Sequence, residues 1–140
     1  MKTVKHSIAL VITGGGGRVL MVLRPTDDES LPGLWGLPAI TTVPGEDEDQ
    51  AVRRAGREKL GVEVLPGTLQ GEAETDRSDY ALRMRNREAT IVRGAPGTPQ
   101  PHEGTQYVDW RWADPIELKP AARAGSLCCQ LLLRAREVPW

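Results

Sequence analysis

The segment from Asp47 to Gly61 constrains the fold most, because it carries a helical pattern between regions whose composition suits strands. Acidic residues crowd its first turn, where they favour the helix dipole, and basic residues follow. Gly61 has the character of a C-terminal cap. Gly56 inside the helix costs about 1 kcal/mol relative to alanine, so we expect close packing of this helix against a sheet to compensate.

Two segments before this helix are rich in β-branched and aliphatic residues and predict strands at 7–13 and 18–24. They flank Gly14 to Gly17, which we interpret as the turn of a hairpin-like pair. A phosphate loop would need Lys-Ser or Lys-Thr after the glycines and then a helix, and neither follows. A short extended segment is expected at 34–40, where Pro38 restricts it to an edge or an irregular position.

Shorter strands and a helical C-terminus are expected after the helix. The region 107–112 alternates polar and apolar residues with period two, which predicts a half-buried strand. The region 115–137 predicts a short helical turn and then a longer helix with leucines at core-facing spacing. Further short strands are predicted at 62–65, 72–75, 80–85 and 89–93.

Length and charge narrow the class of protein. The 140 residues suit one domain, 1–140, and 18 basic against 19 acidic side chains give a formal charge of −1. No surplus of charge draws the chain to nucleic acid or to an anionic membrane. The apolar stretch 8–12 is too short for a signal segment or a membrane span. We therefore expect a soluble cytoplasmic protein without a membrane or nucleic-acid partner.

A set of glycine, glutamate and arginine residues is spaced along and around the helix as in a known motif. Gly45-Glu46 is followed after seven residues by Arg54, and then by Glu58 and Gly61-Val62. These positions match the signature G-x5-E-x7-R-E-U-x-E-E-x-G-U, and the run 33–38 precedes it. The sequence resembles the Nudix hydrolase family over nearly its whole length. The resemblance implies an α/β fold, an α/β/α sandwich around a mixed sheet, and hydrolysis of a diphosphate with Mg²⁺ or Mn²⁺.

The signature is degenerate at the positions that would hold the metal. Positions three or four apart share one helical face, and three carboxylates there would bind a hard cation. In this chain the three positions are Ala55, Glu58 and Lys59. Ile40 stands where the signature begins with a glycine. Two of three carboxylates are replaced, one of them by an ammonium. This pattern predicts the loss of tight metal binding.

Three residues are candidates for catalysis by resemblance. Glu58 and Glu103 are the candidate metal ligands, and Arg54 is expected to brace the carboxylates. The alternative for Glu58 is a solvated carboxylate that pairs with Arg54 or Arg57. Glu103 lies in the loop where many family members place an extra ligand or a general base.

Three further residues are candidates for substrate binding: Arg24, Trp35 and Lys59. Lys59 would contact a diphosphate as a point charge and partly replace the cation. Trp35 either stacks on a base or anchors its loop in the core. Cys128 and Cys129 are interpreted as reduced, partly buried small hydrophobes.

Two functions remain open at this stage. The first is a Nudix-type hydrolase that cleaves the diphosphate linkage of a nucleotide-type small molecule, with activity weakened by the degenerate signature. The second is a catalytically inactive Nudix-fold module that binds a nucleotide or a damaged base. A homodimer is a possible assembly for either.

Overall fold

The computed structural model describes residues 2–99 and 105–140. Its strands form two sheets, one with the order β4-β1-β6-β5 and one with the order β3-β2-β7. The first sheet is mixed, because β6 runs parallel to β1 whereas β4 and β5 are antiparallel to their neighbours. The strands are β1 (Thr3–Val11), β2 (Val19–Leu23), β3 (Trp35–Gly36), β4 (Ala39–Thr41), β5 (Glu63–Asp76), β6 (Tyr80–Arg93) and β7 (Asp109–Ala113).

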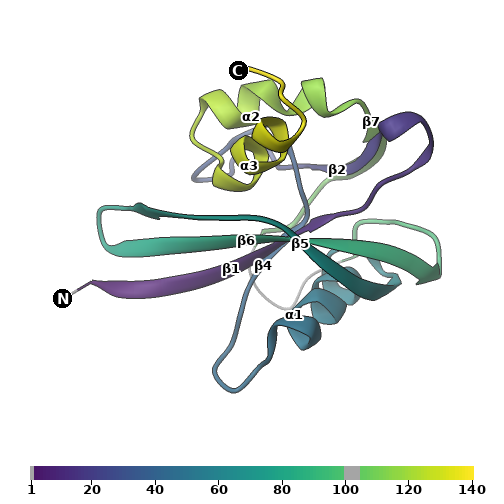
Figure 1. Cartoon of the computed structure of the whole chain (residues 1–140), viewed down its shortest axis with the longest axis horizontal. Coiled ribbons are helices and arrows are strands. Elements are labelled where there is room, and N and C mark those ends of the chain that lie inside the picture. Colours follow the sequence, from purple (N-terminus) through teal and green to yellow (C-terminus); the bar gives the residue numbers. More distant parts are fainter. Residues whose placement is uncertain (1, 100–104) are drawn as a thin grey trace.

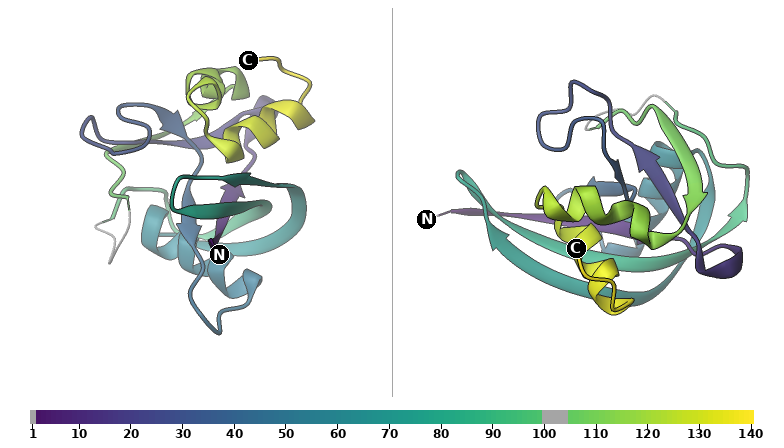
Figure 2. Two further views of the ribbon diagram at one scale, coloured as in Figure 1. Left: turned by 90° about the vertical axis from the view of Figure 1, so that its left-hand side faces the viewer. Right: turned by 90° about the horizontal axis from the view of Figure 1, so that it is seen from above.

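Helices cover the strands from opposite sides (Figure 1). On one side lies α1 (Glu48–Ala55), which the π-helical segment η2 (Gly56–Leu60) continues. On the other side lie α2 (Lys119–Arg123) and α3 (Leu127–Ala135), preceded by the 3₁₀ segment η3 (Pro115–Leu118). A short 3₁₀ turn, η1, spans Gly15–Gly17. Figure 2 shows the same three layers from two further directions. The predicted α/β/α sandwich with a mixed sheet is confirmed.

Both faces of the central strands are buried, which explains their nearly continuous apolar sequence. In β1, Ile8 and Leu10 belong to the cluster that packs on α1, whereas Ala9 and Val11 belong to the cluster that packs on α2 and α3. Side chains alternate between the two faces of a strand, so one strand contributes to both cores. The two cores fix the separation of the helical layers.

The helix expected from Asp47 begins and ends as its sequence predicts. Asp47 caps α1 through a reciprocal box with Gln50, and Gly61 ends the helical region in the left-handed conformation with φ 70°. A Cβ on Gly56 would lie 3.0 Å from Cγ2 of Val64 and 3.1 Å from the carbonyl oxygen of Val62. The close packing expected at Gly56 is confirmed.

Replacing Gly56 with valine is expected to lower the free energy of unfolding by about 2 kcal/mol, because the added atoms meet the backbone of the next segment. Chemical denaturation with the far-UV circular dichroism signal measures the change. Gly97→Val is the matched control, since a Cβ there meets nothing within 4 Å. Equal unfolding midpoints for the two variants would contradict tight packing at Gly56.

Two predictions about strands are wrong. β1 and β2 lie in different sheets. The segments beside the glycine run pair only briefly, through the bridge of Thr13 to Val19 and the bonds from Leu20 N–H to Ile12 O and from Gly14 N–H to Arg18 O, so no regular hairpin of β1 and β2 forms. The four short strands after the helix are two strands of 14 residues each. Irregularities in the β5–β6 register between Pro66 and Gly71 absorb the proline and glycines that suggested breaks.

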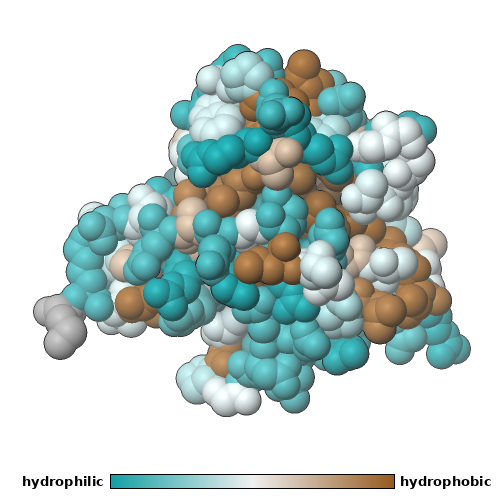
Figure 3. Space-filling model, viewed as in Figure 1, coloured by the Kyte–Doolittle hydropathy of each residue, from teal (hydrophilic) through white to brown (hydrophobic). Residues whose placement is uncertain are grey.

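The surface over α1, the lower layer in Figure 3, is mostly hydrophilic, and apolar side chains gather between the upper helices and the strands. Within the described residues no helix is both long and apolar enough to cross a membrane.

Candidate functional site

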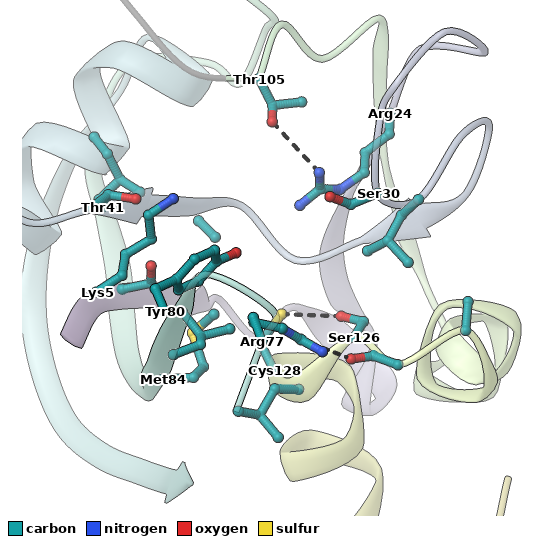
Figure 4. A pocket seen from close by; sticks show the side chains of 18 of the residues that line it. Lys5, Arg24, Ser30, Thr41, Arg77, Tyr80, Met84, Thr105, Ser126 and Cys128 are labelled. Carbon is teal, nitrogen blue, oxygen red and sulfur yellow. Dashed lines mark hydrogen bonds between the residues drawn. The ribbon is translucent and has the colours of Figure 1, made fainter. Parts of the chain in front are cut away.

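A cavity of about 680 Å³ borders the β4 edge of the four-stranded sheet, between the start of β6 and the turn that joins α2 to α3. Figure 4 shows side chains from both ends of the chain pointing into it. Four basic residues and no carboxylate line it among the described residues: Lys5, Arg24, Lys59 and Arg77. The whole chain has nearly balanced charge, so the basic character of this cavity is local and favours an anionic ligand.

Lys59 comes from the π-helical segment and is 4% exposed. Its Nζ donates to the carbonyl oxygen of Thr105 at 3.1 Å and lies 5.6 Å from the ring centre of Tyr107. The side chain thus brings an ammonium into the cavity wall, at a helix position where the Nudix signature has a carboxylate.

Arg24 reaches the same point from the end of β2. Its Nη1 donates to Oδ2 of Asp28 at 3.2 Å and to Oγ1 of Thr105 at 3.5 Å. Burial alone would raise the pKa of Asp28, but the backbone N–H groups of Leu31 and Ser30 and the charge of Arg24 outweigh it and lower that pKa. Asp28 therefore stays ionised and holds the guanidinium in place.

Tyr107 supports this end of the cavity from below. Its hydroxyl accepts a hydrogen bond from the backbone N–H of Ala39 at 3.1 Å. Burial raises the pKa of Tyr107 to about 12, so the phenol is neutral at physiological pH. It contributes shape and an aromatic face rather than charge.

The sequence carries no signal for the contribution of α3 to the cavity. Cys128 is 7% exposed and lines the cavity, with its Sγ 3.5 Å from Oγ of Ser126 (Figure 4). A hydrogen bond from Cys129 lowers the pKa of Cys128 against the effect of burial, with help from Ser126 and Arg24. Both cysteines are free thiols.

Arg54 joins two carboxylates below the cavity. Its Nε donates to Oε2 of Glu46 at 2.7 Å and its Nη2 donates to Oε1 of Glu46 at 3.0 Å. Nη1 lies 3.6 Å from Oε1 of Glu58. Hydrogen bonds from Arg54 lower the pKa of Glu46 and those to Glu46 raise the pKa of Arg54. Neither Glu46 nor Glu58 lines the cavity.

The Glu46 pair predicts a loss of stability in acid. The pKa of Glu46 is lower in the folded than in the unfolded chain. Ionised Glu46 therefore stabilises the fold above the unfolded pKa, and this stabilisation is lost as the pH falls through the folded pKa. Glu46→Gln is expected to cost about 2 kcal/mol at pH 7 and much less near pH 3. Urea unfolding at both pH values tests this, and a constant difference would contradict it.

The described residues do not fit a divalent cation at the helix. Ala55 is fully buried and has no ligand atom, Lys59 presents an ammonium, and Glu58 is paired with Arg54. No group of three His, Cys, Asp or Glu side chains suited to a metal occurs in the ranges that the structure covers. Hard cations take several oxygen ligands. Glu103, the other candidate ligand, lies outside the described residues.

Trp35 lies apart from the cavity. It sits in β3 and packs on the α2–α3 side, where the guanidinium of Arg111 stacks 4.1 Å from its ring centre. Of the proposed substrate-binding residues, the structure therefore brings Arg24 and Lys59 together at Thr105 and leaves Trp35 on another face.

Several solved structures share this fold. A NUDIX hydrolase from Nitrosomonas europaea superposes with a TM-score of 0.75 and 19% identity, covering 95% of this chain and 88% of that one. The solution structure of the E. coli ORF135 protein gives 0.72 and 23%, covering 96% and 92%. These similarities establish the α/β fold.

Sequence comparison leads to the same family. The CTP pyrophosphohydrolase of Escherichia coli (strain K12) is 30% identical over 72% of this chain and 70% of its own length. An isopentenyl-diphosphate Delta-isomerase of Clavibacter michiganensis subsp. michiganensis (strain NCPPB 382) is 28% identical over 75% of this chain, which spans about half of that relative (55%). The family model of the NUDIX domain matches residues 4–127. The chain therefore belongs to the Nudix domain family.

Proposed function

We propose that this chain binds a nucleotide-type small molecule through its diphosphate, and that Lys59 and Arg24 supply the positive charge that a divalent cation supplies in other members of the family. The observation that carries the proposal is the ammonium of Lys59, 4% exposed in the wall of the basic cavity. The guanidinium of Arg24 meets it at Thr105.

The chemistry of these two cations suits a diphosphate. A guanidinium donates two parallel hydrogen bonds to a phosphate, and an ammonium acts as a point charge with three donors. The attraction of both cations to a phosphate is stronger inside a cavity than in bulk water, because the surrounding dielectric constant is lower. Asp28 pairs with Arg24 and offsets part of its charge.

Hydrolysis of the diphosphate is the second candidate function. The 30% identical relative is a CTP pyrophosphohydrolase by name, and Glu58 retains a carboxylate on the helix. Glu58 and Glu103 are the carboxylates that we propose for this activity. Glu58→Gln would abolish phosphate release if the proposal holds and would leave it unchanged if Glu58 only pairs with Arg54.

One screen separates the two candidates. Nucleoside di- and triphosphates, dinucleoside polyphosphates and nucleotide sugars are added in EDTA, and then with Mg²⁺ or Mn²⁺, while thermal unfolding and phosphate release are measured. Binding without a metal raises the unfolding temperature in EDTA, since a ligand at 100 times its Kd stabilises by about 2.7 kcal/mol. If no compound stabilises the chain in EDTA, the proposal of cation-based binding fails.

A further inference from the structure

We propose that the cavity holds a second anionic group of the same ligand, bound by Lys5 and Arg77 at the end opposite to Thr105. The ligand class is then a phosphorylated molecule with two separated anionic groups and an uncharged middle. This inference rests on the proposed function, since it concerns the same ligand, and it adds a contact that a plain nucleoside diphosphate would not fill.

The register of the sheet separates the two basic ends. The first end is the one at Thr105, where Lys59 lies beside the ring of Tyr107. The hydroxyl of Tyr107 accepts from the N–H of Ala39, and Ala39 pairs with Ala9 of β1, so this end is level with Ala9. Lys5 lies four residues earlier in β1 and pairs with Leu82. At the usual rise of a strand, four residues span about 13 Å. Their backbone positions are therefore further apart than the two phosphorus atoms of one diphosphate, so a diphosphate bound at Thr105 leaves Lys5 and Arg77 for a second anionic group.

Lys5 and Arg77 are held beside the cavity by contacts that leave their charge in place. The Nζ of Lys5 lies 4.7 Å from the ring centre of Tyr80, and Nη2 of Arg77 donates to the carbonyl oxygen of Gly125 at 3.3 Å. Figure 4 shows Lys5, Tyr80 and Arg77 around one side of the cavity, with Arg24 and Thr105 on the other. Neutral partners fix the directions of both side chains and do not cancel their charges.

Among the residues that the structure describes, no carboxylate lines this end of the cavity. Asp76, next to Arg77 in sequence, is 3.8 Å from the Nζ of Lys2 and its side chain is 80% exposed. Neither Asp76 nor Asp79 belongs to the described lining. An anion from outside is thus the group that matches Lys5 and Arg77.

The described middle of the cavity carries no Lys, Arg, Asp or Glu side chain, and part of its surface is apolar. Midway between Lys5 and Ala9 lies Ser7, which pairs with Thr41 and Met84, and Leu127 also lines the cavity. A neutral ring or an alkyl segment fits such a surface, because burial of apolar area favours binding there. The order of charged, neutral and charged surfaces defines the expected ligand.

A series of alkane-1,ω-diol bisphosphates with four, six, eight and ten carbons tests the spacing without a choice of base. Hexyl phosphate is the reference with one anionic group. Binding to the whole chain in EDTA is followed by the amide resonances of Thr105 and Tyr80 in ¹⁵N–¹H spectra. We expect one chain length to bind about tenfold tighter than hexyl phosphate, which exceeds the roughly twofold statistical gain of a symmetric ligand. This compound should shift the resonances of both Thr105 and Tyr80.

Variants assign the second contact. The double variant Lys5→Gln with Arg77→Gln is expected to remove the tenfold advantage, so that the bisphosphate and hexyl phosphate differ in Kd only by the statistical factor. Arg83→Gln is the matched control, because Arg83 lies in β6 outside the cavity lining and pairs with Glu74. If no bisphosphate exceeds the statistical gain, or if the double variant keeps the advantage, the inference is overturned.

The outcome distinguishes this inference from the proposed function. If nucleoside diphosphates bind in EDTA and the bisphosphates have no advantage, only the second anionic contact fails. If neither nucleoside diphosphates nor hexyl phosphate nor any bisphosphate binds, the proposed function fails and this inference fails with it.

Discussion

Replacing Lys59 with methionine is expected to weaken the binding of a nucleoside diphosphate in EDTA by about tenfold or more. A hydrogen bond to a charged group contributes about 1.5–3 kcal/mol, and 1.4 kcal/mol corresponds to a factor of ten in Kd. Methionine is also unbranched and keeps the apolar stem of the buried side chain, but it lacks the terminal ammonium and therefore its charge and donors. Isothermal titration calorimetry with the best ligand from the screen measures the change.

Lys59→Glu should weaken binding further, by about a hundredfold, because a carboxylate would then face the phosphates. Arg57→Met is the control, since Arg57 belongs to the same π-helical segment, is exposed and lies outside the lining of the basic cavity. Unchanged Kd values for Lys59→Met and Lys59→Glu, in variants that remain folded, would exclude a contact between Lys59 and the ligand.

Replacing Asn86 with aspartate is expected to lower the free energy of unfolding by about 3 kcal/mol at pH 7, as for an uncompensated buried charge. Asn86 is fully buried, and its Nδ2 donates to Oε1 of Gln70 at 2.9 Å and to the carbonyl oxygen of Cys128 at 3.0 Å. A carboxylate there would face two acceptors. Urea unfolding followed by tryptophan fluorescence measures the loss.

The pH dependence of this variant identifies the cause. Burial raises the pKa of an aspartate, so the penalty should shrink as the pH falls and the introduced carboxyl takes up a proton. Asn86→Leu, which removes the donors without adding charge, should be less destabilised at pH 7 and independent of pH. Equal losses for the two variants at pH 7 would show that charge is not the cause.

Asn86 also links the sheet to the ligand cavity. Its bond to the carbonyl oxygen of Cys128 ties β6 to the start of α3, where Cys128 lines the cavity. A variant that loosens this contact should therefore reduce ligand affinity as well as stability. Within the described parts of the chain, no other side-chain hydrogen bond joins β6 to α3.

Local features of the sequence were sufficient for the helix and the family. The cap at Asp47, the glycine at Gly61 and the spacing from Glu46 to Val62 are short-range patterns, and they predicted the helix, its end and the Nudix resemblance. Pairing between distant strands was not predictable in this way. The separation of β1 and β2 into different sheets depends on their partners β6 and β7, which lie far along the chain.

Spacing along the chain is enough to show that the helix of Asp47 to Gly61 carries Ala55, Glu58 and Lys59 where the family signature has three carboxylates. The position of Lys59 in a cavity that Arg24, Lys5 and Arg77 also line follows from tertiary packing and not from spacing. These residues come from separate elements, and their convergence depends on strand register, on the π-helical turn and on the packing of α3. None of those leaves a local pattern in the chain.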